Sequence, residues 1–147
     1  MDELKDFWDA VEQQLTDTKA ITGIQHIVRG SMGKKPPLQG NQATTWVELP
    51  QNPLINISSD AIPLQTTLSI FITGKSNTNI HQTHLKTLNQ AFKVAFKLQA
   101  FKPLPTDAKN SGCILQLDRD QSFQVVEANP QAYTVVVVFN TKLVVSI

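Results

Sequence analysis

Two stretches of the chain repeat apolar residues at helical spacing. In residues 2–16 the apolar set lies opposite acidic and amide side chains and comprises Leu4, Phe7, Trp8, Val11 and Leu15. In residues 80–100 the predicted buried face is Leu85, Leu88, Phe92, Ala95 and Phe96, widened by Ala91, Val94 and Leu98. This predicts an amphipathic N-terminal helix and one long central helix, largely buried, with a solvent side formed by Lys86, Lys93 and Lys97.

Alternating apolar and polar residues, the pattern of a strand with one covered face, predict the other elements. We expect strands over residues 21–28, 45–49, 66–73, 114–117 and 123–127, followed by a β-prone C-terminal segment. The order is helix, three strands, helix, and two or three strands. It indicates an α+β fold, with one mainly antiparallel sheet and two helices packed on it.

The segment 133–147, YTVVVVFNTKLVVSI, is the most β-prone part of the chain. Its odd-numbered positions are almost all apolar and suit a core covered by helices. Its even-numbered positions include Val136, Val138 and Val144, which we predict to contact a neighbouring subunit, because an uncovered strand recruits another chain. The pattern leaves open whether the segment is one strand of about 50 Å or a hairpin turning at residues 140–141.

Two stretches rich in Gly, Pro, Asn and Gln predict long loops at residues 29–44 and 50–65. Loops of this length in a compact domain are usually either functional or disordered until a partner binds. The first carries a basic cluster, Arg29, Lys34 and Lys35, which we predict to contact a partner, either an acidic protein surface or a phosphate backbone. Plain solvation is the alternative, and the loop has no aromatic residue to stack on a base.

Composition is that of a globular protein. The 147 residues, 41% hydrophobic and 17% charged, fit one domain spanning 1–147. No stretch approaches the roughly 20 apolar residues of a membrane span, and the acidic N-terminus is unlike a signal peptide. We therefore expect a soluble, unsecreted protein with no membrane partner. The single cysteine, Cys113, allows no internal disulfide and fits a reducing compartment.

Charge is unevenly distributed, although the net charge is only +1. Six of the twelve acidic residues lie in the first seventeen positions, against one basic residue there. Residues 18–110 are the reverse, with ten basic and three acidic residues. An acidic helix and a basic body can attract each other within one molecule or between neighbouring molecules. Two solvated faces of opposite sign are the simpler alternative.

No local motif indicates chemistry. The sequence contains no phosphate-binding glycine loop, no paired cysteines and no nucleophile elbow, so we expect neither enzymatic activity nor a cofactor. His81 and His84 share a helix face but lack a third metal ligand nearby, and a polar first turn explains them better. Asp118 and Asp120 suit a divalent cation in principle, although a solvated turn between strands is favoured.

Taken together, the elements resemble the tail terminator proteins, also called tail completion proteins, of tailed bacteriophages. The resemblance covers nearly the whole chain, as a pattern and not through a signature motif. It rests on the helix ELKDFWDAVEQQL, the strand GIQHIVRG running into a long loop, the strands TTWVEL and TTLSIFITG, the helix HLKTLNQAFKVAFKL, and the terminal segment YTVVVVFNTKLVVSI.

The resemblance implies a structural virion protein, located in the tail at its junction with the neck and assembled in the host cytoplasm. Proteins of this family are not enzymes. They form a ring, usually a hexamer, that caps the tail tube, ends its elongation and joins the tail to the neck. Implied partners are further copies of the chain, the tail tube protein, a neck or connector protein and, in a contractile tail, the sheath protein. DNA would pass transiently through the lumen, and the loop with Arg29, Lys34 and Lys35 would reach the tube or that lumen.

Two other interpretations stay open. A small α+β domain can assemble a ligand-binding or catalytic site from residues distant in sequence, which no local motif would reveal. Another neck or baseplate structural protein is also compatible with the pattern.

Overall fold

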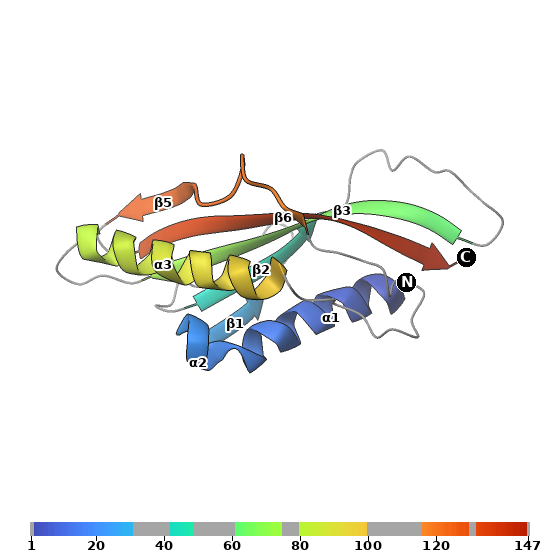
Figure 1. Cartoon of the computed structure of the whole chain (residues 1–147), viewed down its shortest axis with the longest axis horizontal. Helices are drawn as coiled ribbons and strands as arrows, with labels where there is room; N and C mark the ends of the chain where they lie inside the picture. Colours follow the sequence, from blue (N-terminus) through green and yellow to red (C-terminus); the bar gives the residue numbers. More distant parts are fainter. Residues whose placement is uncertain are drawn as a thin grey trace.

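The protein has an α+β fold, as the sequence predicts, with helices on a mixed sheet (Figure 1). The computed structural model describes residues 2–30, 42–48, 61–74, 80–99, 116–129 and 132–146. Within these ranges, the helices are α1 (Asp2–Asp17), α2 (Lys19–Thr22) and α3 (Ile80–Gln99). The strands are β1 (His26–Arg29), β2 (Gln42–Glu48), β3 (Ala61–Gly74), β4 (Gln116–Leu117), β5 (Val125–Asn129) and β6 (Ala132–Ser146).

The two longest strands form the centre of the sheet. The strand order is β1-β2-β3-β6-β4, and β5 also pairs with β6. Only the β1–β2 pairing is parallel among the described strands, so the expectation of a mainly antiparallel sheet is confirmed. β6 is one continuous strand of 15 residues, without a hairpin. It pairs with β3 from Ala61↔Ser146 to Gly74↔Tyr133.

The far end of this central pair extends beyond its neighbours. β2 pairs with β3 only from Thr67 onward, and β4 meets β6 only as far as Asn140. Residues 61–66 and 141–146 are therefore paired only with each other among the described strands, and we call this two-stranded ribbon the arm. Six residues of strand span about 20 Å. In Figure 1 the ends of β3 and β6 reach past α3 on the right of the molecule.

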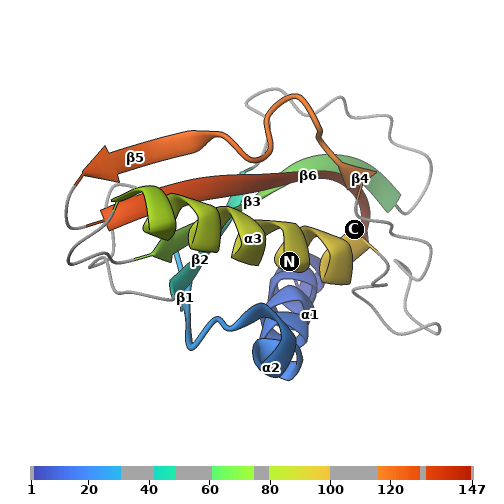
Figure 2. The same ribbon diagram turned by 60° about the vertical axis from the view of Figure 1, so that its left-hand side comes forward.

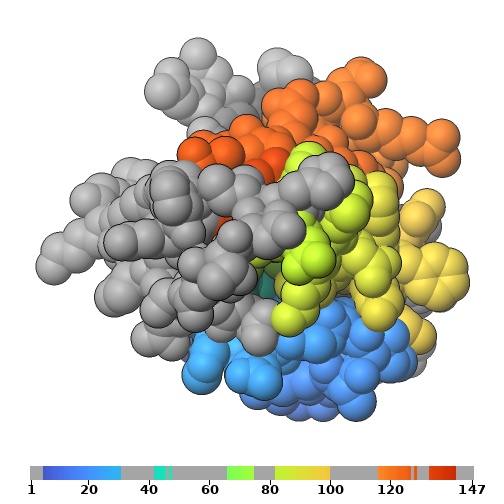
Figure 3. Space-filling view, turned by 90° about the vertical axis from the view of Figure 1, so that its left-hand side faces the viewer, coloured from blue at the N-terminus to red at the C-terminus, as the bar shows by residue number. Residues whose placement is uncertain are grey.

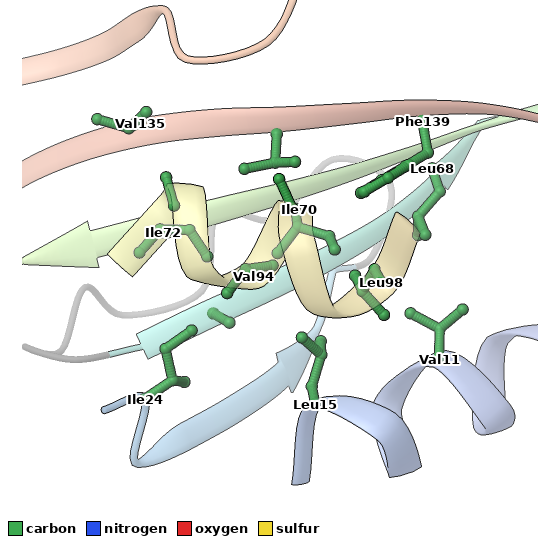
Figure 4. Packing of buried hydrophobic residues seen from close by; sticks show 14 of the residues in the cluster. Val11, Leu15, Ile24, Leu68, Ile70, Ile72, Val94, Leu98, Val135 and Phe139 are labelled. Carbon is green, nitrogen blue, oxygen red and sulfur yellow. The ribbon is translucent and has the colours of Figure 1, made fainter. Parts of the chain in front are cut away.

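The helices cover one face of the sheet and enclose the core between them and the strands (Figure 2). The periodicity of each element supplies the core residues, because alternate positions of a strand and every third or fourth position of a helix share a face. The core comprises Phe7, Val11 and Leu15 of α1, Val94 and Leu98 of α3, Leu68, Ile70 and Ile72 of β3, and Val135, Val137 and Phe139 of β6. Figure 4 shows these side chains converging from both layers.

The first predicted strand, over residues 21–28, is wrong in its first half. Residues up to Thr22 form α2, and β1 begins only at His26. The backbone amides of Ile21 and Thr22 each donate a hydrogen bond to the Thr18 carbonyl oxygen at 3.0 Å, and these bonds close a helical turn despite the β-branched sequence. Gly23 then ends the turn with φ of 77°, a left-handed conformation that glycine adopts without a steric penalty. The chain therefore has a third, short helix in addition to the two predicted.

Both predicted loops are shorter than expected. The first was expected over 29–44, but Arg29 closes β1 and β2 begins at Gln42. The second was expected over 50–65, but β3 begins at Ala61. Pro63 within this stretch suggested irregular structure, yet a strand with few neighbours tolerates proline. Residues 31–41 and 50–60 of the two predicted loops lie outside the described residues.

The long helix is confirmed, and its predicted buried face is confirmed in part. Ala91, Val94, Ala95 and Leu98 are buried and Leu88 packs against the core, as predicted. Leu85, Phe92 and Phe96 were also predicted to be buried, but they are 55%, 48% and 71% exposed. Thr87 takes part in the buried face instead: a Cβ atom on Gly74 of β3 would clash with the Thr87 hydroxyl, so the helix lies tightly against the end of this strand.

Truncating two leucines of α3, one buried and one exposed, tests this orientation of the helix, because the two losses of stability should differ in size. Leu98→Ala should lower the free energy of unfolding by about 2–5 kcal/mol, because it leaves a cavity in a packed core. Leu85→Ala, on the same helix and chemically identical, should cost below about 1 kcal/mol because the side chain is half-exposed. Urea denaturation of both variants measures the difference. Equal losses would mean that α3 is rotated from the orientation described.

Candidate functional site

Arg29, predicted to contact a partner, is bound within the chain. It ends β1 and reaches across to the acidic helix α1. Its Nε and Nη2 donate to the two carboxylate oxygens of Glu12 at 2.8 and 3.0 Å, a bidentate pair, and Nη2 also donates to Asp9 Oδ1 at 2.6 Å. The guanidinium carbon lies 4.6 Å from the centroid of the Trp8 ring.

The sheet completes this cluster from the other side. The Trp8 indole N–H donates to Thr45 Oγ1 at 2.8 Å, and the Thr45 hydroxyl donates to Glu12 Oε1 at 3.2 Å. Thr45 pairs with Arg29 across β1 and β2, so adjacent strands present both residues to the same helix. We call Trp8, Asp9, Glu12, Arg29 and Thr45 the Arg29 cluster.

Electrostatics reinforce the Arg29 cluster. The Glu12 carboxylate, followed by that of Asp9, raises the pKa of Arg29. Lys5, one turn before Asp9, and Arg29 together lower the pKa of the Asp9 carboxyl. The acidic helix is therefore attracted by a basic residue of the same molecule, one of the arrangements that the charge distribution allows. A partner contact by Arg29 stays a prediction, but much of its hydrogen-bonding capacity is used to join α1 to the sheet. Lys34 and Lys35 lie outside the described residues.

Of the three valines predicted to contact a neighbouring subunit, two are buried within one chain. Val136 and Val138 are 6% and 4% exposed. They alternate with the core residues of β6 and so lie on the sheet face opposite the helices. Val144 is part of the arm, paired with Pro63. The subunit contact stays a prediction, and Val136 and Val138 expose little surface for it.

The turn at residues 118–122 lies along the edge of β6, where the Ser122 side chain, in place of a strand backbone, makes hydrogen bonds with Val138. Ser122 Oγ accepts a hydrogen bond from the Val138 amide at 2.9 Å and donates one to the Val138 carbonyl at 3.2 Å. Asp118 Oδ1 accepts hydrogen bonds from the amides of Asp120 and Gln121, and Oδ2 accepts one from Asn140 Nδ2, each at 3.1 Å. The Asn140 amide, followed by the backbone amides, lowers the pKa of the Asp118 carboxyl. The predicted turn at 118–122 is thereby confirmed.

The same turn places an aromatic residue against the outside of α3. Phe123 has φ of 65°, a conformation that costs a non-glycine residue about 1–2 kcal/mol. Its ring centroid lies 4.7 Å from that of Phe92, with the planes at 53°. Strained residues persist where the surrounding structure requires them, and they concentrate at functional sites. Sequence reasoning missed this contact.

The outer face of α3 carries three of the six exposed large hydrophobic side chains among the described residues. Leu85, Phe92 and Phe96 recur at i, i+7 and i+11, and we call these three residues the α3 seam. The residues that directly follow them, Lys86, Lys93 and Lys97, form a parallel lysine stripe. On the opposite border lie Phe123 and the exposed Val125, whose partner Val135 faces the core. Figure 3 shows α3 in yellow-green between β5 and the α1–α2 region.

The described residues provide no metal site. Within the described ranges, no three His, Cys, Asp or Glu side chains lie close enough to hold a metal ion. His84 stacks on Tyr133 of β6, with ring centroids 4.6 Å apart. The His81 side chain and Cys113 lie outside the described part of the chain. None of the described helices combines the length and the apolar character that crossing a membrane requires.

Comparison with known proteins adds no relationship: the sequence matches no protein-family model and no curated protein.

A double-mutant cycle tests the Arg29–Glu12 pair. We expect a coupling free energy of about 0.5–1 kcal/mol between Arg29→Ala and Glu12→Ala, since the groups are partly exposed and bidentate. Arg29→Lys should not restore the coupling, because an ammonium group lacks the planar fork. Denaturant unfolding of the wild type and the variants gives each term. A coupling near zero would show that the pair does not hold α1 to the sheet.

Asp118 should make stability depend on pH in the acidic range. Its pKa is lowered in the folded state, so its stabilising contribution is present above the unfolded pKa of about 3.9 and is lost as the pH falls through the folded value. Asp118→Asn should therefore destabilise the protein at pH 7, and the difference from wild type should shrink below about pH 4. Denaturant unfolding of both proteins at pH 7 and below about pH 4 measures this difference in the free energy of unfolding. A difference independent of pH would contradict a charged Asp118 in this turn.

Proposed function

We propose that this protein is a structural virion protein, the tail terminator of a tailed bacteriophage, which forms a ring on the tail tube. The order of elements supports the resemblance. An acidic helix opens the chain, three strands precede one long helix, and a long β segment follows.

The observation that carries self-assembly is the arm. Among the described strands, residues 61–65 and 142–146 pair only with each other, so no described strand continues the sheet from either edge of the arm there. A two-stranded ribbon is marginally stable in water unless another surface packs on it. The sequence of the arm, with Ile62, Leu64, Leu143 and Val145 at paired positions, favours cover by protein over solvation.

A ring follows if identical subunits associate head to tail and the rotation closes. Such a ring has two different faces. One would bind the last ring of tail tube subunits and block further addition, and the other would bind the neck. The basic residues Lys34 and Lys35 would lie toward the tube or toward the lumen through which DNA passes.

Tail tube growth tests the function directly. The purified protein should run as a ring by size-exclusion chromatography with light scattering. When added to growing tubes of the tail tube protein from the same phage, it should shorten them and appear at one end by electron microscopy. A protein that remains monomeric and leaves tube length unchanged would contradict the proposal.

Charge reversal tests the role of the loop. Lys34→Glu with Lys35→Glu should weaken tube binding or ring formation by at least about tenfold, as expected for loss of two cationic contacts. A matched control with the same change in net charge is Lys19→Glu with Arg119→Glu, two exposed residues on α2 and on the turn before β5. If the loop variant and the control behave alike, the loop is not a contact surface.

A further inference from the structure

The α3 seam is too regular to be ordinary surface. A helix with one apolar face packs that face on the core, and a helix that is apolar on two faces is covered on both. α3 already contributes Ala91, Val94 and Leu98 to the core, yet it exposes Leu85, Phe92 and Phe96 on the other side. Isolated exposed apolar residues need no explanation, but a continuous row with a charged border is typical of an interaction site.

The borders of the α3 seam describe the partner that it fits. On one side runs the lysine stripe, of which no member forms an ion pair with a described residue, although Lys97 lies 5.8 Å from the Phe96 ring centroid. On the other side, Phe123 is held against Phe92 by a strained backbone. The partner should therefore combine an apolar ridge with acidic groups along one of its edges.

One end of the same molecule has these properties. The N-terminal end of α1 and the free end of β6 lie near each other in both Figure 1 and Figure 2, where they are marked N and C. The first turns of α1 contribute Asp2, Glu3 and Asp6. Asp6 is exposed and, among the described residues, forms no ion pair. The arm contributes apolar residues at paired positions.

We propose that the α3 seam and the lysine stripe of one subunit bind the arm and the acidic N-terminal end of α1 of a second copy of this chain. The two surfaces lie on different parts of the molecule, so the contact is heterologous and each subunit keeps one free copy of each surface. The inference deepens the proposed ring and rests on it for the identity of the occupant. Two α3 helices packed seam to seam as an antiparallel pair would instead bring both lysine stripes to the same side, where they repel.

Two variants each remove one half of the contact. The seam variant, Leu85→Gln with Phe96→Gln, changes two exposed side chains and leaves Phe92, whose ring contacts Phe123, in place. The acidic-end variant, Glu3→Lys with Asp6→Lys, reverses the charge opposite the lysine stripe. Ile21→Gln with Val126→Gln is the matched control, because it removes two exposed apolar residues elsewhere. Circular dichroism and the thermal midpoint report whether each variant is folded.

Light scattering after size exclusion should show the wild type and the control as the same oligomer, and the seam variant as a folded monomer. We expect the dissociation constant of the subunit contact to rise at least about tenfold. Lys93→Glu should also weaken assembly, and adding Asp6→Lys should restore it by exchanging the two charges. A seam variant that assembles like the control would overturn the proposal, as would a monomeric wild type.

Mixing the two variants gives the sharpest result. Because the seam variant retains a working acidic end and the acidic-end variant retains a working seam, the mixture should form a one-to-one dimer that grows no further. Under a two-fold seam-to-seam contact, the acidic-end variant would form dimers by itself and the seam variant would stay monomeric. With any other partner on the seam, neither variant would dimerise in the mixture. Either result would overturn the proposal.

Failure of the function is distinguishable from failure of the contact. If the wild type assembles through the α3 seam but never shortens tail tubes, the terminator function fails and the contact stands. If the seam variant still forms rings that cap tubes, the contact fails and the function stands.

Discussion

The antiparallel pairing of β3 with β6 is the constraint on which the rest of the structure depends. It joins 14 residues of one strand to the other. β2 continues the sheet from the free edge of β3, and β4 and β5 continue it from the free edge of β6. The register aligns Leu68 with Phe139 and Ile70 with Val137, which makes one apolar surface from two segments far apart in sequence. α1 and α3 pack on that surface, so the positions of both long helices depend on this register.

Periodicity predicted where the helices and strands lie better than it predicted which of their side chains are buried. The two long helices and the central strands are where the pattern indicates, because their apolar repeats are long. The buried face of α3 was predicted correctly at Ala91, Val94, Ala95 and Leu98 and wrongly at Leu85, Phe92 and Phe96. The three wrong residues are large and apolar, but the helix meets the end of β3 with the side that carries Thr87. Residues 19–22 show a second limit, since backbone hydrogen bonds to the Thr18 and Lys19 carbonyl oxygens close a helical turn where strand propensity predicts a strand.

Of the candidate site, the sequence predicted only that the acidic N-terminal helix and the basic part of the chain can attract each other. The opposite charges of the N-terminal helix and the chain that follows are visible in the sequence, and the Arg29 cluster is one consequence within the molecule. That Arg29 meets Glu12 and Thr45 depends on how α1 crosses β1 and β2, which no local pattern specifies. The α3 seam, by contrast, was present in the sequence as an i, i+7, i+11 row, and only its assignment to the core was wrong. A helix with apolar residues on two sides has both a packing face and a binding face, and sequence alone does not say which is which.

The position of β6 has a consequence for how the chain is made. The strand that contacts three others is also the one that follows them all in chain order. Until the ribosome has synthesised β6, β3 lacks the strand with which it pairs over most of its length. α1 and α3 then have only part of the surface on which they pack. The sheet can close only after the valine-rich stretch has emerged, so folding depends on contacts between distant residues and should be slow. In a nascent chain halted before that point, the edge of β3 that pairs with β6 is open, and an open strand edge can pair with another chain unless a chaperone covers it.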